Sequence, residues 1–214
     1  MRATSDYGKV KPDFSYAFLK RLFDLTFSVV GLLILSPVIV FIGAFIKQED
    51  GGPVFYQGIR VGRYGSLFHM FKFRTMVVNA EKIGGSSTAT DDPRITRVGR
   101  LLRKHKLDEL PQLLNVLKGE MSIVGPRPEV KQYVDMFTNE EKAILSVLPG
   151  ITDWASLWNS DEGKILAGSS DPDKTYLEKI RPTKIKLQLK YVQRRNLRTD
   201  LIIVLETLKT VVCR

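Results

Sequence analysis

Two adjacent carboxylates, Asp108 and Glu109, lie at the start of a short apolar run in a chain whose formal net charge is +10. A strongly cationic segment, residues 100–106, precedes them. A carboxylate can attack phosphorus and form an acyl phosphate, and nearby arginines can hold the phosphate oxygens. The acidic pair is therefore either a local electrostatic patch or a reaction centre.

Phosphoryl transfer requires cations that neutralise the phosphate and position it. Three separated cationic elements could converge on one anionic group: Lys72 with Arg74, Arg103, and Arg127 in the rigid loop Gly125–Pro128. Mg²⁺ keeps several waters and binds phosphate oxygens as well as carboxylates, so one protein carboxylate can suffice as its ligand. These residues are compatible with a phosphate site in which Asp108 contacts Mg²⁺.

A structural interpretation of the same pair stays open. Asp108 is well suited to cap the N-terminus of a helix that has Pro111 in its first turn and Gly119 at its end. Such a cap is common and stabilises a protein by ~0.5–2 kcal/mol. Neighbouring residues on a helix point ~100° apart, so Asp108 and Glu109 would have different roles in a reaction.

Composition limits the number of domains, the kinds of metal site and the classes of partner that are possible. The 214 residues, 43% hydrophobic and 26% charged, are typical of one globular domain. The single cysteine, Cys213, excludes an intrachain disulfide and a cysteine-based metal site, and two histidines argue against a histidine-rich one. The pI near 9.7 predicts an anionic partner, which could be nucleic acid, anionic lipid or a phosphorylated substrate.

Residues 25–46 contain no charge and are long enough to cross a bilayer. Ser36 and Pro37 lie in the middle of this segment, where proline removes a hydrogen bond and bends a helix. The Ser36 hydroxyl is the local candidate to satisfy the freed carbonyl. The residues alone fit either one spanning helix or a re-entrant hairpin that enters and leaves by the same face. Asp24 is predicted to pair with Lys20 or Arg21.

The remaining elements follow from periodicity and from turn residues. Strands are predicted at 54–57, at 71–76 with Lys72 and Arg74 on one face, and at 121–124. Residues 79–92 are predicted as a loop, and residues 184–195 fit a helix or a strand. Helices are predicted at 96–106, at 140–148, and at 201–212 with Thr199 and Asp200 as its cap. The helix at 96–106 is basic and amphipathic, so it could lie on anionic lipid. Trp154 and Trp158 could face the lipid interface or pack in the core.

Taken together, the motifs resemble those of the bacterial sugar transferase family, the monotopic phosphoglycosyl transferases, in their small single-domain form. The resemblance runs from Phe18 to Val212, and the order and joint presence of its motifs make it specific. The motifs are Ser36-Pro37, Pro53–Gln57, Phe71–Met76, Asp92–Thr96 with Gly99-Arg100, Leu107–Gln112, Gly119–Pro128 and Pro149–Thr152.

The resemblance implies an enzyme that moves a phosphosugar from a UDP-sugar to polyprenol (undecaprenyl) phosphate and releases UMP. It implies ping-pong chemistry through a covalent phosphosugar on Asp108, with Glu109 as the partner of the dyad and Mg²⁺ at Asp108. It places Arg103 and Arg127 at phosphate-binding positions and Lys72 and Arg74 in a motif near the site. Pro126 and Pro128 flank Arg127 and belong to the same binding motif. Such an enzyme would initiate a bacterial surface glycan, exopolysaccharide, lipopolysaccharide or glycoconjugate.

The resemblance also favours the re-entrant hairpin at Ser36-Pro37. The expected fold class is α/β (α+β), mostly helical with a small sheet. The expected organisation is an arm at 1–18, a re-entrant membrane helix at 19–48 and a catalytic domain with interfacial helices at 49–214. The expected location is the bacterial inner (cytoplasmic) membrane, with the active site on the cytoplasmic face of the phospholipid bilayer. A homodimer is an open alternative.

Two other functions compete with the enzyme. A non-enzymatic protein could use the basic helices to hold anionic lipids at the membrane surface. A nucleic-acid binder is disfavoured, because no stacking array or known motif accompanies the charge and an apolar segment argues against it. The expected partners are therefore a UDP-sugar, polyprenol phosphate and the bilayer, and not nucleic acid.

Overall fold

The computed structural model describes residues 14–85 and 87–212, and the predicted N-terminal arm lies largely outside this range. Most of the described chain is helical, as predicted, and the strands form two separate two-stranded sheets. The helices are α1 (Phe14–Asp50), α2 (Arg97–Lys104), α3 (Gln112–Lys118), α4 (Lys131–Val134), α5 (Trp154–Trp158), α6 (Glu162–Leu166), α7 (Pro172–Thr175), α8 (Arg181–Arg194) and α9 (Leu197–Val212). The strands are β1 (Phe55–Val61), β2 (Leu67–Phe73), β3 (Ser122–Val124) and β4 (Gly150–Thr152).

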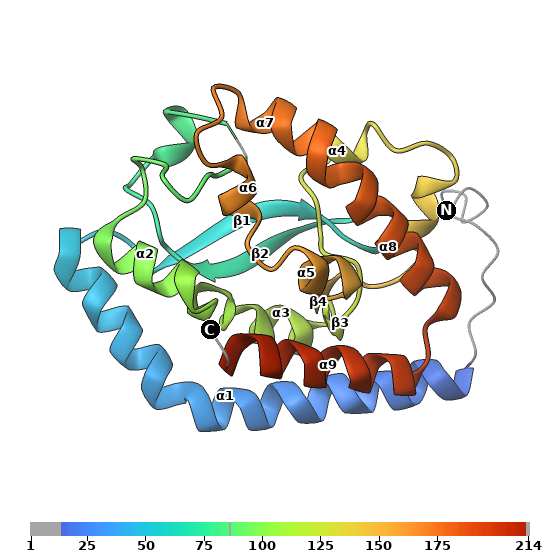
Figure 1. Cartoon of the computed structure of the whole chain (residues 1–214). Coiled ribbons are helices and arrows are strands. Elements are labelled where there is room, and N and C mark those ends of the chain that lie inside the picture. The colour runs from blue at the N-terminus through green and yellow to red at the C-terminus, as the bar shows by residue number, and fades with distance from the viewer. Residues whose placement is uncertain (1–13, 86, 213–214) are drawn as a thin grey trace.

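Helix α1 is continuous through Pro37 and bends part-way along its length (Figure 1). Pro37 cannot donate to the carbonyl of Leu33, and the Ser36 hydroxyl donates to that carbonyl instead, at 2.9 Å. The predicted role of Ser36 is thereby confirmed, and the helix bends without the interruption expected at 36–37. The helix begins at Phe14, so residues 14–18 belong to it rather than to an arm.

Polar side chains of α1 fasten it to the rest of the chain. Asp24 is buried and accepts hydrogen bonds from the Ser122 hydroxyl and the next backbone N–H, both at 3.0 Å. Arg21 donates to two carbonyls at the C-terminal end of α3, and Lys20 pairs with Asp200 at 2.9 Å. Neither Lys20 nor Arg21 forms the predicted direct ion pair with Asp24 within the described residues, because both cations bind other groups, although Lys20 still acts electrostatically on Asp24.

The opposite side of α1 is apolar and exposed. Within residues 14–85 and 87–212, α1 is the one helix long and apolar enough to cross a membrane, and little of its apolar stretch is buried. Helix α9 lies beside it and exposes apolar residues of its own (Figure 1). The larger exposed apolar residues of the two helices include Phe18, Leu22, Leu33, Ile34, Val40 and Phe41 on α1 and Leu201, Leu205 and Leu208 on α9.

Strands β1 and β2 form an antiparallel hairpin that pairs Phe55 with Phe73 and Val61 with Leu67. Strand β1 is longer than predicted, and β2 begins four residues before the predicted strand, because the hairpin continues up to the turn at 62–66. Residues 74–76, which were predicted as strand, lie beyond the end of β2. Phe68 and Met70 pack against α3 and Met121, while Phe73 packs against α1 and α2. The hairpin thus lies between helices on both faces and carries Lys72 close to its end.

Strands β3 and β4 are parallel and approach closely where Gly125 meets Gly150. A Cβ on Gly150 would lie 2.0 Å from the backbone nitrogen of Gly125, so no side chain fits there. Strand β3 confirms the prediction for residues 121–124. Trp154 packs against the core cluster behind these strands, whereas Trp158 is exposed.

The C-terminal third is helical. The segment 184–195, which fitted either element, is helical up to the end of α8 at Arg194, and a π-helical turn at Tyr176–Ile180 joins α7 to α8. The helix predicted at 140–148 is a 3₁₀ helix at Glu141–Ser146. The predicted Thr199-Asp200 cap of the last helix is wrong, because α9 begins at Leu197 and the Asn196 side chain accepts from the Thr199 N–H at 2.9 Å.

Candidate active site

The acidic pair lies on a 3₁₀ turn, Leu107–Glu109, between α2 and α3. The predicted N-cap role of Asp108 is wrong, because α3 begins at Gln112 and Pro111 occupies the capping position. The predicted end of α3 is confirmed, since Gly119 adopts φ 79° there. Successive residues of a 3₁₀ helix point about 120° apart, so the two carboxylates project in different directions.

Glu109 is held by two cations from distant parts of the chain. Arg127 donates to both carboxylate oxygens, with a distance of 2.9 Å at Oε2, and Lys72 donates to Oε1 at 3.0 Å. Burial raises the pKa of Glu109, but Arg127 and Lys72 more than offset this effect, so the pKa falls below its ordinary range. Glu109 is therefore ionised and fixed in place.

Asp108 is buried but weakly held. Its Oδ2 lies 3.7 Å from Lys72 Nζ, and no other ion pair or hydrogen bond of its side chain occurs within the described residues. Burial raises the pKa of Asp108 and Lys72 lowers it, with the net direction upward. Its oxygens are thus available to a ligand, in contrast to those of Glu109.

Arg103 reaches the dyad from α2. Thr96, the first residue of the predicted helix, is the N-cap of α2, and its hydroxyl accepts from the Gly99 N–H at 3.0 Å. A Cβ on Gly99 would lie 2.1 Å from the Thr75 carbonyl oxygen, so only glycine lets α2 approach this strand end. Arg103 Nε donates to the Thr75 hydroxyl at 2.9 Å and acts electrostatically on Asp108. The terminal nitrogens of Arg103 make no hydrogen bond within residues 14–85 and 87–212.

Helix α2 ends at Lys104, two residues earlier than predicted. Lys106 adopts left-handed backbone angles, φ 58° and ψ 17°, which cost a residue with a side chain ~1–2 kcal/mol. Its side chain is half-buried, and burial lowers the pKa of its ammonium while Glu109 and Asp108 raise it. The strained backbone is what turns the chain from α2 into the 3₁₀ turn.

Arg74, which was predicted to bind phosphate with Lys72, instead contacts the end of α1 and the residues that follow it. It is buried, donates to both carboxylate oxygens of Asp50 at 2.6 and 2.5 Å, and also donates to the Pro53 carbonyl at 2.6 Å. Arg74 thus ties the end of α1 to the hairpin. The predicted phosphate contact of Arg74 is not supported, because its donors serve these structural contacts.

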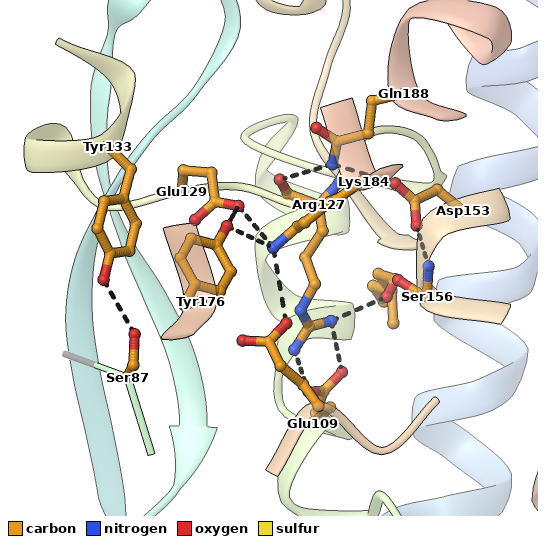
Figure 2. A network of polar contacts seen from close by, with 12 residues as sticks. Ser87, Glu109, Arg127, Glu129, Tyr133, Asp153, Ser156, Tyr176, Lys184 and Gln188 are labelled. Carbon is orange, nitrogen blue, oxygen red and sulfur yellow. Dashed lines mark hydrogen bonds and ion pairs between the residues drawn. The ribbon is translucent and has the colours of Figure 1, made fainter. Parts of the chain in front are cut away.

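Arg127 is positioned by a buried polar group behind it (Figure 2). Asp153 is fully buried; its Oδ2 accepts from the Arg127 backbone N–H and from Gln188, both at 3.2 Å, and its Oδ1 accepts from the Ser156 N–H at 2.6 Å. Gln188 also donates to the Arg127 carbonyl at 3.3 Å.

The prolines that flank Arg127, Pro126 and Pro128, are both buried. The Pro126 carbonyl accepts from the Gly150 N–H at 2.9 Å, which fixes the loop to β4. This places the two prolines in the support of Arg127, and no observation assigns them a direct contact with substrate.

A second ion pair, which was not predicted, lies next to this loop. Lys184 of α8 contacts Glu129 at 2.5 Å, and the Tyr176 hydroxyl donates to the same carboxylate oxygen at 2.6 Å (Figure 2). Burial lowers the pKa of Lys184, but Glu129 more than offsets it and the net direction is upward. Glu162 lies 3.9 Å from Lys184 and acts electrostatically on Arg127 as well.

Comparison with known proteins identifies the family of this chain. The model of the family described as "Bacterial sugar transferase" matches residues 15–214. The chain belongs to the bacterial sugar transferase family.

Three relatives show how the match is distributed. The UDP-N-acetylgalactosamine-undecaprenyl-phosphate N-acetylgalactosaminephosphotransferase of Aeromonas hydrophila is 36% identical over 95% of this chain and 46% of its own length. The undecaprenyl-phosphate galactose phosphotransferase of Salmonella typhimurium is 38% identical over 94% of this chain and 42% of its own. The exopolysaccharide production protein ExoY of Rhizobium meliloti is 36% identical over 95% and 89%. The chain thus spans less than half the length of the first two relatives.

The residues of this bacterial sugar transferase allow a narrow test of the expected Mg²⁺. No cluster of three or more histidine, cysteine or acidic side chains that could hold a metal occurs within the described residues. Both oxygens of Glu109 already bind cations, whereas Asp108 has oxygens to offer. Mg²⁺ suits such a place, because it accepts one carboxylate together with phosphate oxygens and water.

Sequence reasoning found the dyad, Arg103 and Arg127 but missed their supports. Asp153, Gln188 and the pair of Lys184 with Glu129 are separated along the chain and meet through the packing of α5 and α8. Lys106 was noted as part of a basic run, and its left-handed backbone had no signal in the sequence. These supports became visible in the three-dimensional contacts.

Proposed function

We propose that this bacterial sugar transferase moves a phosphosugar from a UDP-sugar to undecaprenyl phosphate and releases UMP. The observation that carries the proposal is a buried carboxylate, Asp108, that lacks hydrogen bonds within the described residues and lies among the cations Lys72, Arg103 and Lys106. The printed names of two relatives, which specify undecaprenyl-phosphate sugar phosphotransferases, support the acceptor class.

In the first half-reaction, a carboxylate oxygen of Asp108 attacks the phosphorus that bears the sugar. A bond forms between Asp108 and phosphorus, the bond to the bridging oxygen breaks, and UMP leaves with that oxygen. Arg103 and Lys72 neutralise charge on the transferred phosphoryl group, which is the main task of a protein in phosphoryl transfer.

In the second half-reaction, an oxygen of undecaprenyl phosphate attacks the same phosphorus. The bond to Asp108 breaks, the carboxylate is restored, and the product is polyprenol diphosphate sugar. One site serves both half-reactions, so UMP leaves before the lipid phosphate binds. This order is ping-pong, and it requires that the donor alone can load the enzyme.

Glu109 acts in this scheme as a positioning residue. Both of its oxygens hold cations, so it orients Arg127 and Lys72 toward the phosphate rather than accepting a proton. Its lowered pKa keeps it ionised throughout the reaction.

Mg²⁺ bound by Asp108 and by the substrate phosphates would supply further neutralisation of phosphate charge. Its protein ligand would be Asp108. Removal of the ion is expected to weaken donor binding, because the donor phosphates would share it.

The proposed membrane placement rests on the apolar faces of α1 and α9. Both helices expose large apolar side chains, while Lys20, Arg21 and Asp24 of α1 contact the rest of the domain. We propose that α1 dips into the inner membrane and returns to the cytoplasmic face, with its bend at Pro37 in the lipid. This placement would bring the active site to the level of the lipid-bound phosphate.

A panel of UDP-sugars tests the function. Purified protein in detergent is mixed with Mg²⁺, undecaprenyl phosphate and each sugar donor, including N-acetylgalactosamine, galactose and glucose, and UMP release is measured. We expect release with at least one donor and none without the lipid phosphate beyond a single turnover. A folded protein that releases UMP from no donor would contradict the proposal and favour a lipid-binding protein without activity.

A further inference from the structure

Lys106 lies at the joint between α2 and the turn that carries the dyad. Its N–H donates to the Arg103 carbonyl at 3.2 Å, and its carbonyl accepts from the Glu109 N–H at 3.3 Å. Its φ of 58° is a conformation that lysine rarely adopts. Strained backbone of this kind concentrates at functional sites, and here it fixes the direction in which the side chain leaves the joint.

The Lys106 side chain differs from the other cations of the site. Lys72 and Arg127 bind Glu109, and Arg103 binds Thr75. The Lys106 side chain is half-buried, and the negative charges of Glu109 and Asp108 act on its ammonium. This ammonium makes no hydrogen bond or ion pair within the described residues. A partly buried cation without a counter-ion is unfavourable, which points to an anionic ligand.

The charge balance of the site points the same way. Four cations, Lys72, Arg103, Lys106 and Arg127, face two carboxylates, which leaves a surplus of two positive charges. A nucleotide diphosphate sugar brings about two negative charges on its phosphates.

We propose that Lys106 is a diphosphate-binding residue whose ammonium donates to the phosphate oxygens of the nucleotide sugar. The left-handed backbone directs the side chain to a place where the charges of Glu109 and Asp108 both act on its ammonium, while Arg103 approaches from the preceding turn. The inference rests on the proposed function, since it identifies a further residue that binds the same donor.

A purely structural role for Lys106 makes a different prediction. If the residue served only to form the left-handed joint, asparagine or glycine would serve at least as well, because both adopt positive φ more readily. Lys106→Asn and Lys106→Gly therefore keep the joint and remove the charge. Lys106→Arg keeps the charge.

The test measures the affinity of UDP in the presence of Mg²⁺ by calorimetry on the detergent-purified full chain. We expect Lys106→Asn and Lys106→Gly to weaken UDP binding by roughly 10–100-fold, the loss of one charge-assisted contact, and Lys106→Arg to stay within about threefold of the wild type. Lys104→Asn is the matched control, because Lys104 is exposed on α2 and carries the same charge. We expect it to bind UDP within about twofold of the wild type.

Two results would overturn the inference about Lys106. One is wild-type affinity in both charge-free variants, and the other is an equal loss in Lys104→Asn, which would indicate a general field rather than a contact. Unchanged melting temperatures in the charge-free variants are expected and exclude unfolding as the cause of weaker binding. Failure of the wild type to bind UDP or to release UMP would overturn the proposed function as well.

Discussion

Two groups of buried carboxylates occupy different regions of this molecule, one where α1 is fastened to the domain and one on the turn at 107–109. Asp200, in the first group, accepts from the Tyr191 hydroxyl at 2.8 Å and from both Lys20 and Tyr16 at 2.9 Å. Asp108, in the second, has one ion pair at 3.7 Å within the described chain. Burial is nearly the same in both, so the number of satisfied oxygens separates a structural carboxylate from one that is free to react.

Asp108→Asn should produce the largest change in activity. A carboxamide cannot form the acyl phosphate, so we expect UMP release to fall by about 10³-fold or more, with no loss of stability. Stability should hold because the variant removes a buried charge that has few partners. UMP release and thermal unfolding of the same preparation measure both effects, and near-normal turnover would show that Asp108 is not the nucleophile.

Asp200→Asn should show the opposite pattern. Removal of one partner from a buried charge pair leaves Lys20 without its counter-ion, so we expect a loss of about 3 kcal/mol in the free energy of unfolding. Turnover per folded molecule should remain within about twofold, since Asp200 lies outside the site. Denaturant titration and UMP release measure the two quantities. A stable but inactive variant would erase the distinction between the two groups of carboxylates.

Glu109→Gln should lower turnover by roughly 10–100-fold, a smaller effect than that of Asp108→Asn. The neutral amide cannot hold Arg127 and Lys72 together, so both cations lose their orientation. The loss should appear mainly in kcat, because the cations remain present to attract the donor. If Glu109→Gln matched Asp108→Asn in severity and still bound UDP normally, Glu109 would have a direct chemical role.

Pro37→Ala should change the placement of α1 and leave the chemistry of the isolated site intact. Alanine restores the hydrogen bond to the Leu33 carbonyl, so the helix should straighten and shift toward a spanning orientation. Single cysteines introduced beside residues 14 and 50 in a Cys213→Ser background can be labelled from either side of the membrane. Labelling of both ends from one face in the variant, as expected for the wild type, would count against this role for Pro37.

The sequence predicted the parts of the fold that depend on local chemistry. Gly119 ends α3 and Ser36 satisfies the carbonyl that Pro37 leaves free, because each of these depends on neighbours within four residues. The halves of β1 and β2 nearest the turn were not predicted as strand, since they are stabilised by pairing across the hairpin rather than by their own composition.

Long-range contacts account for the differences between the predictions and the structure. Arg74 lies in a motif beside Lys72, yet the end of α1 provides Asp50 as its partner. Asp108 has the sequence features of an N-cap, but the left-handed residue before it starts a 3₁₀ turn instead. Asp24 has two cations close in sequence, and both bind groups that the chain supplies much later. Tertiary partners of this kind leave no periodic signal in the sequence.

The central claim is that Asp108 carries the phosphosugar, and the mass of the intact protein after incubation with donor alone tests it most directly. The active UDP-sugar and Mg²⁺ are added without undecaprenyl phosphate, with Asp108→Asn and Asp200→Asn treated in parallel. The account predicts that the wild type and Asp200→Asn gain the mass of one phosphosugar, release one equivalent of UMP, and lose the added mass when undecaprenyl phosphate is supplied, while Asp108→Asn gains nothing. Turnover with both substrates but no added mass and no UMP from the donor alone would contradict it.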